Sequence, residues 1–370
     1  MYYISVGDEW SPPELTAYDE EDGIVEIEIT GIYNLHEIGV YLITYTAIDS
    51  DDNIATYTIY LHVVEEVGGV PPSDFPEMDE DALSILKSDF QSDRSSLIQR
   101  YLDPFNEATY YASLNGLTGQ DFVNQLHIIL SSNIYPTSYG EARFILEKSD
   151  AINTPWGTYL YGIYSNHKIV RYWDGGSTWS REHVWPNSRL GVGRVGNSNR
   201  GIAADPHNLR AINTNVNSTR SNRYFINGTG SINETVGSNG YYPGDDHRGD
   251  VARILFYMYV RYLGTLDLVD AIEEILSGSS YEASGTKFGV LSVLIDWHYL
   301  DPVSDFELHR NDVIYSYQGN RNPFIDNPDY VSIIFNVESP SSNEIMTVTV
   351  IIPRTDINLS ELEKRKYYYV

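Results

Sequence analysis

Hydrophobic and polar positions alternate along residues 1–65 with the period of a β-strand. In the stretch 24–30, Val25, Ile27 and Ile29 share one face, and glutamate and threonine side chains occupy the other. The same alternation returns at residues 41–47 and 55–64, with turn residues between the runs. We therefore predict an all-β sandwich over residues 1–65.

The pattern changes after this first region. We interpret residues 66–84 as a linker, because two Gly and three Pro residues lie within 67–76. Beyond it, apolar residues follow helical spacing, and strand-like runs and loops lie between the helices, so we predict an α+β domain over residues 85–338. The helical stretches are residues 80–101 and 119–131 and an amphipathic helix over 249–263. Residues 339–370 contain one strand-like run and a short charged helix, and are expected to be a tail or the start of another module.

Turn and strand residues of the first region carry a resemblance. Tyr18-Asp19-Glu20-Glu21-Asp22-Gly23, Gly39-Val40-Tyr41 and Tyr45-Thr46-Ala47 are similar to the corresponding positions of Ig-like modules in bacterial surface and secreted proteins. The resemblance implies an Ig-like sandwich and an extracellular setting, either secreted or at the cell surface.

Composition excludes several classes of protein. The 370-residue chain has no Cys, so disulfides and Cys-ligated metal sites are impossible. No apolar run reaches the roughly 18 residues of a membrane span. No basic segment followed by an apolar one stands at the start of this sequence, so we expect no signal peptide within it.

Charge is distributed unevenly along the chain. The formal net charge is −28, from 24 Lys+Arg and 52 Asp+Glu, and residues 1–86 contain 20 of the acids and none of the bases. Residues 151–261 contain 12 bases and 7 acids, a local excess of +5. The whole chain thus disfavours nucleic acid as a partner, but this middle region permits it, because phosphate binding needs Lys and Arg.

Two segments carry candidate chemistry. In the first, residues 179–188, the adjacent Glu182 and His183 offer an oxygen ligand for a hard cation and a base that titrates near neutrality. On an extended segment their side chains point to opposite sides unless a bend brings them together. In the second, if residues 209–220 are helical, Asn213, Asn217 and Arg220 form a polar stripe. An Asn-rich loop is an equal alternative for this segment.

Together the two segments resemble the bacterial endonuclease I family, of the His-Me finger (ββα-metal) class. The family's motifs stand here as Arg181-Glu182-His183, Asp205-Pro206-His207-Asn208-Leu209 and Val216-Asn217-Ser218-Thr219-Arg220-Ser221-Asn222. Later blocks, among them Trp297-His298, Glu307-Leu308-His309-Arg310-Asn311-Asp312 and Gln318-Gly319-Asn320-Arg321, also match. The resemblance spans about residues 85–335 and implies a ββα-metal core.

The resemblance implies a role for each of the principal motif residues. His183 would be the general base that takes a proton from the attacking water, with an ordinary pKa near 6.5. Glu182 and Asn217 would hold one divalent cation, Mg²⁺ first, with Mn²⁺ and Ca²⁺ as alternatives. The substrate would be DNA, with RNA as a second candidate, cleaved without sequence preference by a monomer.

Other residues would support that site. Arg194, Arg210 and Arg220 are candidates for binding flanking phosphates, because a guanidinium matches two phosphate oxygens. A structural ion pair is the alternative for Arg220, and a scaffold role is the alternative for Arg210. The residues expected to support the site structurally are Arg181, His207, Asn213 and Gln318.

Two other functions compete with a secreted, metal-dependent endonuclease. A catalytically inactive relative could bind nucleic acid only, but the intact Glu182, His183 and Asn217 argue against it. A surface adhesion protein could use the Ig-like domain, but that hypothesis leaves the basic middle region unexplained.

Overall fold

The structure is a computed structural model, and it describes two compact units within the chain. Described are residues 2–13, 15–19, 22–50, 54–65, 76, 80–101, 105–155, 157–165, 167–230, 232–277, 280–281, 285–337 and 347–350. The first unit contains the described residues up to 65 together with 155, 157 and 347–350, and the second contains those within 76–154 and 158–337. Most of the predicted linker and the charged segment after residue 350 lie outside the described residues.

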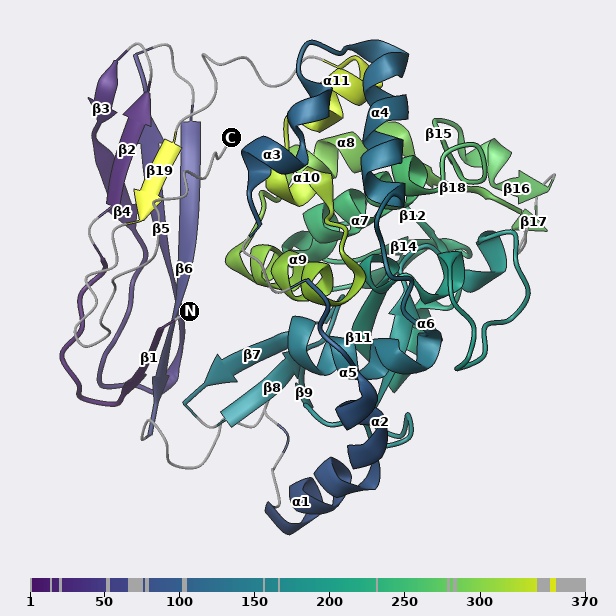
Figure 1. The fold of residues 1–370 in the computed structure, drawn as a ribbon. Helices are drawn as coiled ribbons and strands as arrows, with labels where there is room; N and C mark the ends of the chain where they lie inside the picture. Colours follow the sequence, from purple (N-terminus) through teal and green to yellow (C-terminus); the bar gives the residue numbers. More distant parts are fainter. Residues whose placement is uncertain are drawn as a thin grey trace. The chain divides into compact units, whose positions relative to one another are not determined.

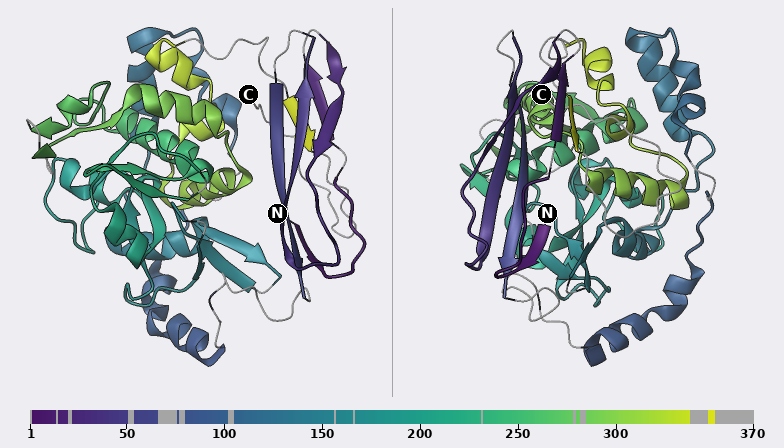
Figure 2. Two further views of the ribbon diagram at one scale, coloured as in Figure 1. Left: turned by 180° about the vertical axis from the view of Figure 1, so that it is seen from behind. Right: turned by 90° about the vertical axis from the view of Figure 1, so that its left-hand side faces the viewer.

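The first unit is built from two sheets. One sheet has the strand order β1-β6-β5-β4 and the other has the order β19-β2-β3. Figures 1 and 2 show these strands in two layers that run nearly along one direction. The strands are β1 (Tyr2–Ser5), β2 (Leu15–Asp19), β3 (Gly23–Val25), β4 (Ile27–Thr30), β5 (Gly39–Ile48), β6 (Ile54–Val64) and β19 (Thr347–Val350).

Alternation along the central strands builds the core of this unit. On β5, Ile43, Tyr45 and Ala47 are buried, and the residues between them face outward. Ala47 packs with Ala17 of the other sheet, so the core lies between the two layers. The single strand predicted at 24–30 is instead two strands, β3 and β4, which pair in different sheets. The chain changes sheets at Glu26, a common corner in β-sandwiches.

A strand from far along the chain completes the second sheet. The strand-like run predicted after residue 339 forms β19, which pairs antiparallel with β2. Val348 lies opposite Ala17 in this pairing. The second unit is therefore inserted, in sequence, between β6 and β19 of the first.

The second unit mixes helices with short strands. Its helices are α1 (Glu80–Asp89), α2 (Gln91–Ser96), α3 (Glu107–Tyr110), α4 (Gly119–Ser131), α5 (Tyr139–Ser149), α6 (Thr214–Arg220), α7 (Arg248–Arg261), α8 (Leu291–Leu300), α9 (Asp305–Gln318), α10 (Pro323–Asp326) and α11 (Tyr330–Phe335). Its strands are β7 (Ala151–Thr154), β8 (Gly157–Tyr161), β9 (Lys168–Val170), β10 (Trp179–His183), β11 (Leu209–Asn213), β12 (Tyr224–Phe225), β13 (Glu234–Val236), β14 (Gly240–Tyr242), β15 (Asp267–Val269), β16 (Leu276–Ser277), β17 (Ser280–Tyr281) and β18 (Lys287–Val290). Helix α1 thus begins before residue 85, the predicted start of this domain.

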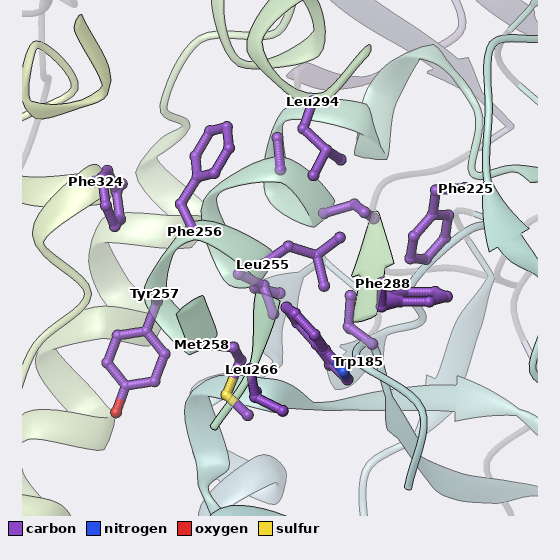
Figure 3. Packing of buried hydrophobic residues seen from close by; sticks show 14 of the residues in the cluster. Trp185, Phe225, Leu255, Phe256, Tyr257, Met258, Leu266, Phe288, Leu294 and Phe324 are labelled. Atoms are coloured by element: carbon purple, nitrogen blue, oxygen red, sulfur yellow. The ribbon is translucent and has the colours of Figure 1, made fainter. Parts of the chain in front are cut away.

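Helix α7 forms the centre of the largest hydrophobic core. Figure 3 shows Leu255 and Met258 of this helix among Trp185, Phe288 and Leu294. The sequence pattern predicts an amphipathic helix over 249–263, and the structure has a helix there, but nearly every residue of α7 is buried. Because α4, α8 and α10 all pack against it, α7 has no solvent-facing side.

Buried ion pairs satisfy the charged residues of this central helix. Asp250 pairs with Arg210 of β11 at 2.7 Å, and Arg253 pairs with Glu307 of α9 at 2.6 Å. A buried charge without a partner would be strongly destabilising. The pairs therefore fix β11 and α9 against α7, and β11 is one of the strands that carry the candidate site.

Candidate active site

The candidate catalytic residues lie on two antiparallel strands and the helix that follows them. β10 pairs with β11, with Glu182 opposite Arg210 and His183 opposite Leu209. Helix α6 begins directly after β11 (Figure 1). The sequence pattern allows a helix over the whole of residues 209–220, but only 214–220 are helical, because residues 209–213 pair as a strand.

Asn213 marks the boundary between this strand and the helix. Its side-chain oxygen accepts hydrogen bonds from the backbone N–H groups of Asn215 at 2.9 Å and Val216 at 3.4 Å. Asn is among the best N-cap residues because it satisfies these otherwise unpaired donors. Asn213 thus fixes where α6 starts, and so where Asn217 lies one turn later.

Glu182 and Asn217 are brought to the same side of β10. Asn217 donates from Nδ2 to Ser180 Oγ at 2.7 Å, and Arg220, one turn later on α6, lies 3.2 Å from Glu182. Glu182 is buried and accepts a hydrogen bond from Tyr164 at 3.0 Å. Burial raises the pKa of its carboxyl, and Arg220 and the Tyr164 hydroxyl lower it in part.

His183 points to the other side of the strand. It is half-buried, and its Nε2 lies 2.8 Å from the carbonyl oxygen of Ala203. A carbonyl oxygen only accepts, so Nε2 carries the proton and the lone pair of the neutral ring is on Nδ1. The ring stacks on Tyr139, with centroids 5.3 Å apart at 21°.

The environment of His183 changes its titration from the sequence expectation. Burial lowers its pKa to about 4, the Ala203 carbonyl opposes this shift, and Arg181 and Arg220 add to it. The ordinary value near 6.5 is thus replaced by one well below neutrality. His183 is therefore in its neutral, proton-accepting form at neutral pH.

His183 opens into a cleft of about 700 Å³. The lining contains two arginines, two asparagines and one aromatic ring, and no carboxylate. The charged, amide and aromatic side chains of this lining are Tyr139, Arg181, His183, Asn187, Arg194 and Asn197. Such a wall of cations and amides suits an anionic ligand.

Arg181 is the better anchored of the two cleft arginines. Its guanidinium lies 3.5 Å from the centre of the Tyr139 ring and donates to the Tyr139 carbonyl and to Asn197. Burial lowers its pKa to about 10, which leaves it charged at neutral pH. Arg194 also lines the cleft, and its side chain is exposed. The sequence predicts a supporting role for Arg181, whereas the structure lines the cleft with it.

Arg210 and Arg220 are placed in the scaffold instead. Arg210 is fully buried between Asp250 at 2.7 Å and Asp150 at 3.4 Å. Arg220 is equally buried, pairs with Glu182, and donates to the carbonyl of Val184 at 2.6 Å. A guanidinium enclosed in this way does not reach a phosphate in a surface cleft, so the structure favours the scaffold alternative for both.

His207 and Gln318 lie in a buried network behind the site. His207 has its Nε2 3.2 Å from the carbonyl of Asn320, and burial lowers its pKa to about 4. Gln318 donates to Asp205 at 3.0 Å and to Asn320 at 2.9 Å. Both residues therefore tie the segment before β11 to the end of α9.

Two contributors to the site have no sequence signal that could have located them. Ala203 acts through its backbone carbonyl, which every residue type has. Tyr139 is 44 residues from His183 in sequence, and only the capping box of Ser138 and Glu141, a readable motif, marks the start of its helix. Their proximity to His183 is a tertiary property.

The donor set of Glu182 and Asn217 fits a hard divalent cation. Within the described ranges, no hydrogen bond reaches Glu182 Oε2 or Asn217 Oδ1, so one carboxylate and one amide oxygen remain for a ligand. The described part of the chain holds no group of three or more His, Asp or Glu side chains suited to a metal. It also contains no helix long and apolar enough to cross a membrane.

Comparison with known proteins identifies both regions. The family model for endonuclease I matches residues 118–329, and that for the Ig-like domain of bacterial surface proteins matches residues 1–63. An extracellular ribonuclease of Bacillus subtilis is 38% identical over 237 residues, which are 61% of this chain and 78% of that protein. An extracellular ribonuclease of Bacillus amyloliquefaciens is 36% identical over 236 residues, with the same shares covered.

Members of endonuclease I are generally metal-dependent, which agrees with the oxygen ligands left available on β10 and α6. The family match covers more than half of the 370 residues, and the relatives cover the same region. The chain also contains a bacterial surface Ig-like domain, which precedes the nuclease region in the sequence. This chain therefore belongs to the endonuclease I family and is a nuclease, that is, a phosphodiester hydrolase.

Proposed function

We propose that this protein is a secreted, metal-dependent endonuclease that cleaves both RNA and DNA without sequence preference, with His183 as the general base. The observation that carries the proposal is the hydrogen bond from His183 Nε2 to the Ala203 carbonyl at 2.8 Å. It leaves Nδ1 as the proton acceptor in a cleft lined by two arginines.

His183 is suited to remove a proton from water. Its lowered pKa keeps it neutral at neutral pH, and the Ala203 carbonyl stabilises the imidazolium that forms when Nδ1 takes the proton. The Tyr139 ring limits rotation of the imidazole through the stacked contact. A positioned base of this kind contributes about 10²–10⁴-fold to the rate.

Arg181 and Arg194 would hold the phosphate oxygens. Both line the cleft beside His183, and Arg181 is fixed by Tyr139 and Asn197. A fixed guanidinium aimed at developing negative charge lowers the barrier more than a mobile one, because no reorganisation is needed during the reaction.

Glu182 and Asn217 would hold the divalent cation, Mg²⁺ in our proposal, through their free oxygens. The ion would supply charge neutralisation at the scissile phosphate and its leaving oxygen. Because Glu182 and His183 face opposite sides of β10, the proposal requires the substrate phosphate to lie at the end of this strand, at His183. Together, β10, β11 and α6 would then be the ββα-metal core of the His-Me finger class.

Substrate choice follows from the kind of contacts available. Guanidinium and amide groups recognise the backbone rather than base edges, which favours cleavage without sequence preference. Both relatives are named ribonucleases, so RNA is proposed as a substrate beside DNA. Their extracellular names and the Ig-like domain support secretion.

Digestion of matched RNA and DNA oligonucleotides tests the proposal. We expect the wild type to cleave both with Mg²⁺ and neither with EDTA. His183→Ala should lower the rate about 10²–10⁴-fold while retaining nucleic-acid binding. Undiminished cleavage by His183→Ala would remove the general-base assignment, and binding without any cleavage by the wild type would indicate an inactive relative.

Anomalous diffraction from a crystal soaked in Mn²⁺ tests the ligand assignment separately. The ion is expected beside Glu182 and Asn217. An ion bound elsewhere, with cleavage intact, would require a different ligand set.

A further inference from the structure

A second groove of about 420 Å³ lies on the nuclease unit and shares no lining residue with the catalytic cleft. It is formed by the end of α5, by β7 and β8, by the chain after β9, and by α9. We propose that this groove is an exosite that binds the phosphodiester backbone of the substrate strand outside the catalytic cleft. The inference rests on the proposed function.

The charge of the groove points to an anion. Lys148, Arg171 and His309 line it, and no Asp or Glu does. The chain as a whole carries 52 acids against 24 bases, so a lining with two bases and no acid has the opposite sign to the net charge of the chain. Lys148 and His309 are exposed and Arg171 is half-buried, which leaves these groups accessible to a ligand.

The polar groups of the groove are held in place by contacts that leave donors available. Arg171 donates from Nε to the carbonyl of Glu147 at 2.7 Å, and its two terminal nitrogens form no hydrogen bond within the described residues. Thr158 donates to Asn153 Oδ1 at 2.9 Å, so the Asn153 amide nitrogen is the atom left for a ligand. A fixed guanidinium beside an amide N–H₂ group matches phosphate oxygens.

His309 and Lys148 are linked through the backbone. The Nε2 of His309 lies 3.0 Å from the carbonyl oxygen of Lys148, and the Lys148 ammonium contacts the Tyr317 hydroxyl. These contacts anchor Lys148, which lines the groove together with Arg171.

The spacing of the two sites suits one nucleic-acid strand. Tyr139, at the first residue of α5, lines the catalytic cleft, and Lys148, near the last residue, lines the groove. At a rise of 1.5 Å per residue, these positions are about 14 Å apart along the helix axis. One strand of a duplex carries a phosphate every 3.4 Å of axis, so about four nucleotides separate the sites.

The test measures binding of labelled single strands to the full-length chain carrying His183→Ala, as a function of salt. Lys148→Met and Arg171→Gln are combined, and the exposed Lys87→Met is the matched control because Lys87 lies in α1, outside both sites. For a strand of about 20 nucleotides, we expect the double variant to bind about tenfold more weakly. We also expect the slope of log affinity against log salt to fall by about 1.4, because two phosphates are no longer neutralised by the protein. The control should change neither the affinity nor the slope.

A strand of about four nucleotides, which fills only the catalytic cleft, should bind the double variant as tightly as the parent. An unchanged salt slope with the long strand would overturn the exosite. The exosite would also be overturned if the double variant lost binding of inorganic phosphate but still bound the long strand as tightly as the parent. That result would indicate a site for a free anion. Melting curves check the fold, and Lys148→Met alone, which preserves the Arg171 anchor, should show half the slope change.

Failure of the proposed function is read separately. Cleavage of the short strand by the wild type depends on the catalytic cleft only. If the wild type does not cleave it, the proposed function fails; if cleavage is intact and the slope is unchanged, only the exosite fails.

Discussion

Replacing Arg220 by methionine separates a scaffold arginine from a substrate arginine. The side chain is buried, pairs with Glu182 at 3.2 Å, and donates to the carbonyls of Val184, His183 and Ser221 at 2.6–3.3 Å. Methionine retains much of the volume but leaves one carboxylate and three carbonyls without this donor. Removing one partner of a buried pair costs about 3–5 kcal/mol.

This loss is large beside the roughly 5–15 kcal/mol that stabilises a folded domain. For a unit of this size it corresponds to a fall in Tm of about 10 °C. Guanidinium-chloride unfolding gives the free energy, and calorimetry gives the Tm. Arg194→Met is the matched control: Arg194 is exposed in the cleft, so its loss should cost under about 0.5 kcal/mol yet weaken substrate binding.

A double-mutant cycle with Glu182→Gln completes the experiment. Because Glu182 is the charge left unpaired, removing it as well should restore part of the stability that Arg220→Met loses. The reasoning is refuted if Arg220→Met costs less than about 1 kcal/mol while nucleic-acid affinity falls. That pattern would return Arg220 to the phosphate-binding group.

Three further predictions concern the same unit. Tyr139→Leu removes the ring stacked on His183 and should lower the rate of single-turnover cleavage about 2–10-fold, whereas Tyr139→Phe should retain the rate. Equal rates for the wild type and both variants would contradict the positioning role. Burial holds the pKa of His207 at about 4, below the 6.5 of a histidine in an unfolded chain. The unfolded state therefore binds the proton first, and the free energy of unfolding falls as the pH drops from 6.5 to 4, by about 2 kcal/mol at pH 5. His207→Gln should reduce the difference in unfolding free energy between pH 7 and pH 5 by that amount. EDTA should abolish cleavage but shift the Tm by less than about 2 °C, because only two side chains are expected to hold the ion; a large fall in Tm would reveal a structural metal instead.

The strands of the Ig-like unit and the long helices could be predicted from the sequence because their periodicity reflects burial on one side. The pattern failed where burial had another cause. Helix α7 is covered on every side, and its charged residues are paired inside, so the polar positions that suggested a solvent face do not mark one. At 24–30 the alternation is continuous, but the chain changes sheets at Glu26.

The sequence also located the residues of the candidate site better than their surroundings. The motifs indicate an extended segment for Glu182 and His183 and allow a helix for Asn217, and the structure has them on β10 and α6. Which arginine faces the cleft could not be read in the same way. Arg181 and Arg210 are both strand residues. Arg210 is buried because Asp250 of α7 pairs with it, whereas Arg181 lines the cleft, where it packs on Tyr139 of α5.

The pairing of β19 with β2 has a consequence for shortened versions of the protein. A truncation placed just after α11, to trim the chain behind the nuclease, would strip a strand from the Ig-like sandwich at the other end of the sequence. Strand β2 would then have unpaired backbone groups along one edge, and such edges recruit strands from other molecules. Aggregation of the shortened protein would thus originate in the domain that the truncation was meant to spare.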